Sequence, residues 1–177
     1  PDVPVELVSG DLLKNTLTQD PQFFYRATPA VARELIKEYE TVIKIDCDSV
    51  VCGDISALWT EKFDVAMPNN SNPKEMEKYP VSVWNIHGLS YLNCGLVAMQ
   101  NETFIDHWWK LCTSPHFNFY QFREQDLVNI MIFYGMYKAK FLDNGNSFWG
   151  LASKLYWPQV ELKKDKLEAE NHIKEIC

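Results

Sequence analysis

The sequence has no long apolar run and no basic cluster of the kind that binds nucleic acid. No apolar stretch approaches the roughly 18 residues of a membrane-spanning helix, so the sequence predicts no transmembrane segment. The 17 basic residues are outnumbered by 24 acidic ones, and the formal net charge is −7. The tightest basic group lies within residues 163–166 and is interrupted by an acidic residue. We therefore expect no nucleic-acid partner.

Cysteines are few, and none of them forms a Cys-x-x-Cys pair. The five are Cys47, Cys52, Cys94, Cys112 and Cys177. Cys47 and Cys94 lie in apolar, strand-like segments, which favours buried free thiols. Free thiols are typical of a reducing compartment, so we expect a cytoplasmic protein. Glycosylation sequons at Asn69 and Asn101 weakly favour the alternative, a Golgi lumen, if a longer chain carries an N-terminal anchor.

The length and composition suit one domain with a sizeable core. The chain has 177 residues, of which 46% are hydrophobic and 14% aromatic. Strand-like and helical segments alternate along it, which predicts an α/β fold with a mostly parallel central sheet and helices on both faces. The predicted strands are 5–8, 42–45, 92–99 and 137–142. Because the chain starts at Pro1 without Met and ends at Cys177 within an apparent helix, we expect residues 1–177 to be a single domain incomplete at both ends.

Two helices have recognisable start signals. Thr28 and Pro29 predict an N-cap and first helical position for a helix over 29–40. Asn101 is expected to cap a later helix, because apolar residues follow at helical spacing. A further helix is expected to carry Glu124 in its first turn, where acidic residues suit the helix dipole.

The segment at 41–49, Thr-Val-Ile-Lys-Ile-Asp-Cys-Asp-Ser, is the most informative part of the chain. The two-residue period of a strand places Asp46 and Asp48 on one face and Cys47 on the other. Two adjacent carboxylates repel each other unless a cation lies between them. Carboxylate oxygens at such a strand end suit Mn²⁺ or Mg²⁺, and open α/β sheets bind ligands there. The alternative is a strand end whose carboxylates accept hydrogen bonds from turn amides.

Three blocks of sequence, in this order, resemble glycosyltransferase family 8. The first is Phe24-Tyr25-Arg26 with residues 42–59, the second is residues 91–99, Tyr-Leu-Asn-Cys-Gly-Leu-Val-Ala-Met, and the third is residues 123–129, Arg-Glu-Gln-Asp-Leu-Val-Asn. The family comprises retaining, metal-dependent enzymes of the GT-A nucleotide-sugar transferase fold, similar to glycogenin and to bacterial lipooligosaccharide galactosyltransferases. The resemblance covers roughly residues 24–149.

The resemblance implies an enzyme that moves a hexose from a UDP-sugar donor to a hydroxyl of a glycan, a lipid-linked saccharide or a protein. Asp46 and Asp48 would hold Mn²⁺ (or Mg²⁺) against the donor diphosphate. The residues implied to bind the donor are Arg26, Asp46, Cys47 and Asp48. The residues implied to act on the sugar or acceptor are Asn93, Glu124 and Gln125.

The sequence departs from the family pattern at three points. The family has a third metal ligand in a His-x-x-Gly segment, but His172 is followed by Ile-Lys-Glu, so we do not assign that role to it. The first strand of the fold should precede Val5 and is missing from this sequence. Glu124 occupies a position where Asp is commoner in the family. Its side chain is longer, which changes its expected contact with the sugar.

The candidate residues also have simpler interpretations. Arg26 can be interpreted as a surface charge beside a helix. Asn93 can be interpreted as a buried side chain that makes a fixed internal hydrogen bond. Glu124 and Gln125 can be interpreted as residues that stabilise a helix N-terminus.

Two other functions remain open on the sequence. A haloacid-dehalogenase-type phosphohydrolase also begins with an apolar strand and Asp-x-Asp, but it needs further acidic residues, and Asp64 and Asp143 are isolated. A non-catalytic carbohydrate-binding relative of the transferase fold is the second alternative.

Overall fold

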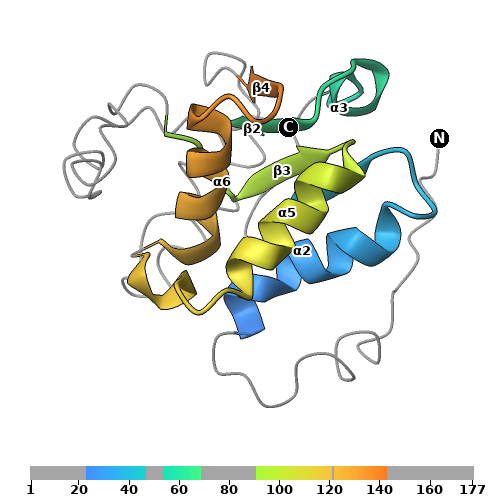
Figure 1. The fold of residues 1–177 in the computed structure, drawn as a ribbon. Helices are drawn as coiled ribbons and strands as arrows, with labels where there is room; N and C mark the ends of the chain where they lie inside the picture. Colours follow the sequence, from blue (N-terminus) through green and yellow to red (C-terminus); the bar gives the residue numbers. More distant parts are fainter. Residues whose placement is uncertain (1–22, 47–53, 69–90, 121, 143–177) are drawn as a thin grey trace, which may run out of the picture.

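The computed structural model describes residues 23–46, 54–68, 91–120 and 122–142 (Figure 1). The strand predicted at 5–8 and the residues Cys47 and Asp48 lie outside these ranges. The α-helices are α2 (Phe23–Leu35), α3 (Ala57–Thr60), α5 (Glu102–Cys112) and α6 (Arg123–Phe133), and a short 3₁₀ helix is η3 (Phe117–Phe119). The strands are β1 (Val42–Ile45), β2 (Val65–Pro68), β3 (Leu96–Met99) and β4 (Ala139–Leu142).

The four described strands form one mixed sheet in the order β1-β3-β2-β4. β3 pairs antiparallel with both β1 and β2, whereas β2 and β4 are parallel. The α/β class is confirmed, but the prediction of a mostly parallel sheet is wrong for these strands. The reason lies just before β3, where the Asn93 N–H donates to the Pro68 carbonyl at 2.9 Å. The chain thus re-enters the sheet at the carboxyl end of β2 and can only run back along it.

The side chains of the sheet alternate between two apolar layers, as the two-residue period of strands requires. In β3, Val97 and Met99 face the larger layer, and Leu96 and Ala98 face the smaller one. Helices α2, α5 and α6 contribute to the larger layer, and the short α3 contributes to the smaller one (Figure 1). Helices on both faces of the sheet are therefore confirmed. None of the described helices is long and apolar enough to cross a membrane.

Helix α2 begins earlier than its sequence predicts. Its first residue is Phe23, so Pro29 lies inside the helix and Thr28 is not its N-cap. Tertiary contacts stabilise the additional first turn, because the Arg26 Nε atom donates to the Cys112 carbonyl at 2.8 Å. Tyr39, which would lie on the predicted helix, follows α2 and is 48% exposed. The helix ends at Leu35 instead of residue 40.

The later helices follow their predicted signals. The Asn101 side chain accepts a hydrogen bond from the Phe104 N–H at 3.0 Å, so it caps α5 as expected. Phe104 and Trp108 are fully buried in the larger layer. Glu124 and Asp126 lie in the first turn of α6, also as expected.

We predict that Phe104→Ala lowers the free energy of unfolding by about 3–5 kcal/mol, because it removes a fully buried ring and leaves a cavity. Phe119→Ala makes the same chemical change at a ring that is 81% exposed, and it should cost less than about 0.5 kcal/mol. Urea denaturation followed by circular dichroism measures both values. Equal losses for the two variants would contradict the described core.

Candidate functional site

The carboxyl ends of β1, β2 and β4 meet at one edge of the sheet, because these three strands run in the same direction. Asp46 follows β1 directly, and its N–H donates to the Gly95 carbonyl at 2.8 Å. Asn93 lies at the same edge, hydrogen-bonded to the last residue of β2. Two residues that are 47 positions apart in the sequence, both predicted to belong to the site, are thus brought to one place, and it is the edge where open α/β sheets bind ligands.

Asp46 forms an ion pair with Lys44, which lies two residues earlier on the same face of β1. The Lys44 ammonium also donates to the Cys94 carbonyl at 2.7 Å. Both side chains are half-buried, with 27% of Lys44 and 36% of Asp46 exposed. Lys44 was not among the predicted site residues, although its two-residue spacing from Asp46 places the two side chains on the same face of the strand. The predicted partner carboxylate, Asp48, lies outside the described residues, as does Cys47.

Two amide side chains of α6 attach this helix to the segment before β3. The Gln125 Oε1 atom accepts from the Cys94 N–H at 2.9 Å, and its Nε2 atom donates to the Tyr91 hydroxyl at 3.3 Å. Asn129 accepts from the Leu92 N–H at 2.6 Å and donates to the Leu92 carbonyl at 2.9 Å. These bonds fix the first turn of α6 beside the sheet edge. The two bonds of Gln125 use its amide oxygen and one of the two N–H donors of its amide nitrogen.

Glu124 lies in that first turn, and its Oε2 atom is buried without a hydrogen-bond partner among the described residues. Burial raises the pKa of its carboxyl from 4.5 to about 7. The negative charge of Asp46 also raises the pKa of Glu124. A hydrogen bond from the backbone N–H of Glu124 and the positive charge of Lys44 lower it. Glu124 is thus electrostatically coupled to both members of the ion pair. Its neighbour Arg123 has a φ of +48°, an uncommon conformation for a residue other than glycine.

The simpler interpretation, that Glu124 serves the helix N-terminus, is compatible with these contacts, because Glu124 lies in the first turn of α6 and its carboxyl accepts from its own backbone N–H. The carboxylate that accepts from the backbone before α6 belongs to Asp126, whose Oδ2 atom receives the Phe122 N–H at 2.8 Å. The other Asp126 oxygen accepts from the Tyr91 hydroxyl at 2.6 Å. Glu124 is left with unused hydrogen-bonding capacity at the sheet edge.

Asn93 combines a structural bond with a free donor. Its Oδ1 atom accepts from the Gly95 N–H at 2.7 Å, which shapes the turn before β3. The expected internal hydrogen bond is therefore present. The Asn93 NH₂ group makes no hydrogen bond to another described residue, so it remains available to a ligand.

Arg26 is held by neighbouring elements and is not an unattached surface charge. Besides its bond to the Cys112 carbonyl, its guanidinium lies 4.8 Å from the centre of the Phe117 ring. Cys112 is the last residue of α5, so Arg26 links α2 to the end of this helix. These contacts are with α5 and η3, and they give Arg26 a structural role that the sequence did not predict.

Oxygen atoms, and not sulfur, are the ligands that this edge offers to a cation. Burial raises the pKa of Cys94 and of Cys112, so both remain neutral thiols and poor metal ligands. The described residues contain no group of three His, Cys, Asp or Glu side chains that could hold a metal ion. They do contain two carboxyl groups of the type that hard divalent cations bind, Asp46, which is paired with Lys44, and Glu124 with its unpartnered oxygen.

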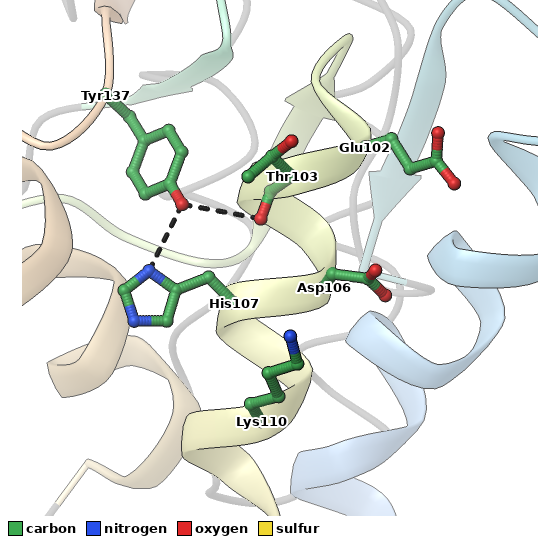
Figure 2. A pocket seen from close by; sticks show the side chains of 6 residues that line it. All are labelled: Glu102, Thr103, Asp106, His107, Lys110 and Tyr137. Carbon is green, nitrogen blue, oxygen red and sulfur yellow. Dashed lines mark hydrogen bonds between the residues drawn. The ribbon is translucent and has the colours of Figure 1, made fainter.

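A separate surface hollow of about 280 Å³ lies on α5, away from this edge (Figure 2). Its lining residues are Glu102, Thr103, Asp106, His107, Lys110 and Tyr137. The Tyr137 hydroxyl contacts His107 Nδ1 at 3.1 Å and the Thr103 carbonyl at 3.4 Å (Figure 2). Asp106 is already paired with Arg33 at 2.6 Å. Three of the side chains that line this hollow, Tyr137, His107 and Asp106, are therefore engaged with each other or with α2.

Comparison with known proteins gives no match: no family model, no curated protein and no solved structure is significantly similar to this chain.

We predict that Glu124→Gln removes a pH dependence of stability. The pKa of Glu124 is about 7 in the folded protein, whereas its ordinary value is 4.5. Between these two pH values the folded protein retains a proton that the unfolded chain has lost, so this carboxyl destabilises the fold progressively as the pH rises. Above pH ~7 the variant should be more stable than the wild type by roughly 2–3 kcal/mol.

Urea denaturation between pH 4 and pH 8 measures the difference between the two proteins. Glu38→Gln, at an exposed carboxylate just after α2, controls for the loss of one negative charge. Parallel pH profiles for wild type and Glu124→Gln would show that Glu124 is not buried as described.

Proposed function

We propose that this chain is a metal-dependent retaining glycosyltransferase of the family 8 type, with a GT-A-related fold, that moves a hexose from a UDP-sugar to a hydroxyl acceptor. One observation carries the proposal. Asp46, Asn93 and Glu124 come from three distant segments, each selected from its own motif, and they converge at the carboxyl edge of the sheet. A chance resemblance of three short motifs gives no reason for this convergence.

Asp46, together with Asp48, would hold the divalent cation. When bound, such an ion acts as a Lewis acid that neutralises charge developing on the departing diphosphate. The side chains of the chain itself would bind and orient the sugar. The free NH₂ group of Asn93 would donate a hydrogen bond to a sugar oxygen. The buried Glu124 oxygen would accept a hydrogen bond from a sugar hydroxyl.

The unpartnered Glu124 oxygen is a specific reason to expect a polyhydroxylated ligand. A buried polar atom without a partner costs about 1–3 kcal/mol. A hydroxyl group that donates to this oxygen would remove that cost on binding. Gln125, whose amide is held by Cys94 and Tyr91, would keep Glu124 in place, and its remaining N–H donor would help to orient the sugar.

A phosphohydrolase of the haloacid-dehalogenase type is less well supported. Asp64 precedes β2 and therefore lies at the opposite end of the sheet from Asp46. Its oxygens accept from the Asn101 side chain at 2.7 Å and from the Lys138 N–H at 2.6 Å. Asp143 lies outside the described residues. A non-catalytic carbohydrate-binding relative would keep the same residues at the carboxyl edge of the sheet. It would differ from the enzyme by binding the UDP-sugar without releasing UDP.

The acceptor is proposed to be a saccharide, a lipid-linked saccharide or a protein, and the compartment to be cytoplasmic. The two described cysteines, Cys94 and Cys112, are free thiols, which agrees with a reducing compartment.

We predict that the chain binds UDP-hexoses in a Mn²⁺-dependent manner, and that Asp46→Asn weakens this binding at least about tenfold because a carboxylate holds the bridging ion. Titration calorimetry with and without Mn²⁺ measures the affinity, and Asp48→Ala should behave in the same way. Asp54→Asn, the same change at an exposed residue just before α3, is the matched control.

Equal UDP-sugar affinity in wild type, Asp46→Asn and Asp48→Ala would refute the assignment. Metal-dependent binding combined with no release of UDP, over a panel of saccharide acceptors, would favour the binding relative instead of the enzyme.

A further inference from the structure

The glycosylation sequon Asn101-Glu102-Thr103 lies among the described residues, and its Asn side chain is part of the fold. The Asn101 Oδ1 atom accepts from the Phe104 N–H at 3.0 Å. Its Nδ2 atom donates to the Asp64 Oδ1 atom at 2.7 Å. The oxygen and the nitrogen of this side-chain amide therefore both have a partner within the protein.

Asp64 joins the starts of three elements at this point. Its Oδ2 atom accepts from the Lys138 N–H at 2.6 Å. Its backbone N–H donates to the Lys138 carbonyl at 3.0 Å, and its carbonyl accepts from the Gln100 N–H at 3.1 Å. Asp64 precedes β2, Lys138 precedes β4 and Asn101 precedes α5. The Asn101 amide thus belongs to a junction that holds these three elements together.

The Asn101 amide has one orientation that satisfies both partners. Turned over, its NH₂ group would face the Phe104 N–H and its oxygen would face the Asp64 carboxylate, and both hydrogen bonds would be lost. Asn101 and Asp64 are half-buried, so water replaces these bonds less readily than at an open surface. Glu102 already lies in the first turn of α5, whereas an acceptor sequon is expected in a surface loop.

We infer that N-glycosylation of Asn101 and this fold exclude each other, so that the sequon is a structural junction and not an acceptor in the folded chain. In the transfer, the amide nitrogen would form a bond to the anomeric carbon of a lipid-linked oligosaccharide. The bond from that carbon to the lipid diphosphate would break, and the nitrogen would lose one proton. This nitrogen is the atom that contacts Asp64, and a saccharide is far larger than the hydrogen it replaces.

The inference bears on the compartment and is independent of the proposed transferase activity. In a lumen that carries out this transfer, a chain modified before α5 forms would lack the bond between Asn101 and Asp64. Chains that escape the transfer would reach the described fold. A compartment without the reaction imposes no such loss, which agrees with the cytoplasmic location proposed above.

Translation of the full chain behind a secretory signal, in the presence of microsomes, tests the inference. Asn69→Gln removes the other sequon, so that Asn101 is the remaining acceptor. We expect molecules with a glycan at Asn101 to be cleaved by thermolysin at least about tenfold faster than unmodified molecules, because proteolysis follows the population of open chains. Mass spectrometry identifies the modified residue.

A matched control places the glycan elsewhere. Glu38→Asn with Glu40→Thr creates a sequon at exposed residues after α2. Thr103→Ala disables the natural sequon and keeps the Asn101 amide, and Asn69→Gln is retained. Glycosylated and unmodified molecules of this control should be cleaved at the same rate. Equal protease resistance of molecules with and without a glycan at Asn101 would overturn the inference.

Absence of transfer to Asn101, with the control sequon occupied, leads to one further comparison. Phe104→Ala destabilises α5 and leaves the sequon intact, so the inference expects this variant to be modified. If it also stays unmodified, the sequence and not the fold prevents the transfer, and the inference is wrong.

A measurement on the wild-type protein needs neither a variant nor a glycan. The Asn101 Nδ2 proton that faces Asp64 should exchange with solvent at least about tenfold more slowly than in the urea-unfolded chain. Nuclear magnetic resonance of the side-chain amides measures this rate. Exchange as fast as in the unfolded chain would show that the amide is free, contrary to the inference.

Discussion

The attachment of α6 to the segment before β3 is the constraint on which the candidate site depends. Asn129 satisfies both backbone groups of Leu92, and Gln125 satisfies the N–H of Cys94. This segment makes a turn and does not continue the β3 ladder, so its backbone groups need other partners. Amide side chains have both a donor and an acceptor, and they can meet that need where an apolar side chain cannot. The same bonds bring Glu124 to the sheet edge.

Local signals in the sequence predicted much of this arrangement. The Asn101 cap, the acidic first turn of α6 and the strand before Asp46 all follow from residues close together in the chain. Asn93 and Glu124 were selected by motif, and tertiary contacts place them at one edge. Asp48 lies outside the described residues. The carboxylate pair therefore stays a prediction.

The features that the sequence did not predict depend on partners far away in the chain. Helix α2 extends past its expected cap because Arg26 bonds to Cys112, 86 residues later. The direction of β3 depends on where the chain re-enters the sheet. The bond from the Cys94 N–H to Gln125 joins α6 to the segment before β3, and the motif did not predict it. No local pattern of residues encodes such contacts, because they depend on the relative placement of whole elements.

The start of α6 combines two features that cost free energy. Arg123 adopts a left-handed φ, and the next residue, Glu124, buries an oxygen that has no partner among the described residues. Each feature costs on the order of 1–3 kcal/mol. Such features persist only where the surrounding structure holds them in place. Here the bonds from Gln125 and Asn129 to the segment before β3 fix α6 against the sheet. The unused oxygen of Glu124 is therefore a consequence of how α6 is attached, and it lies next to the residues that the sequence predicted for the site.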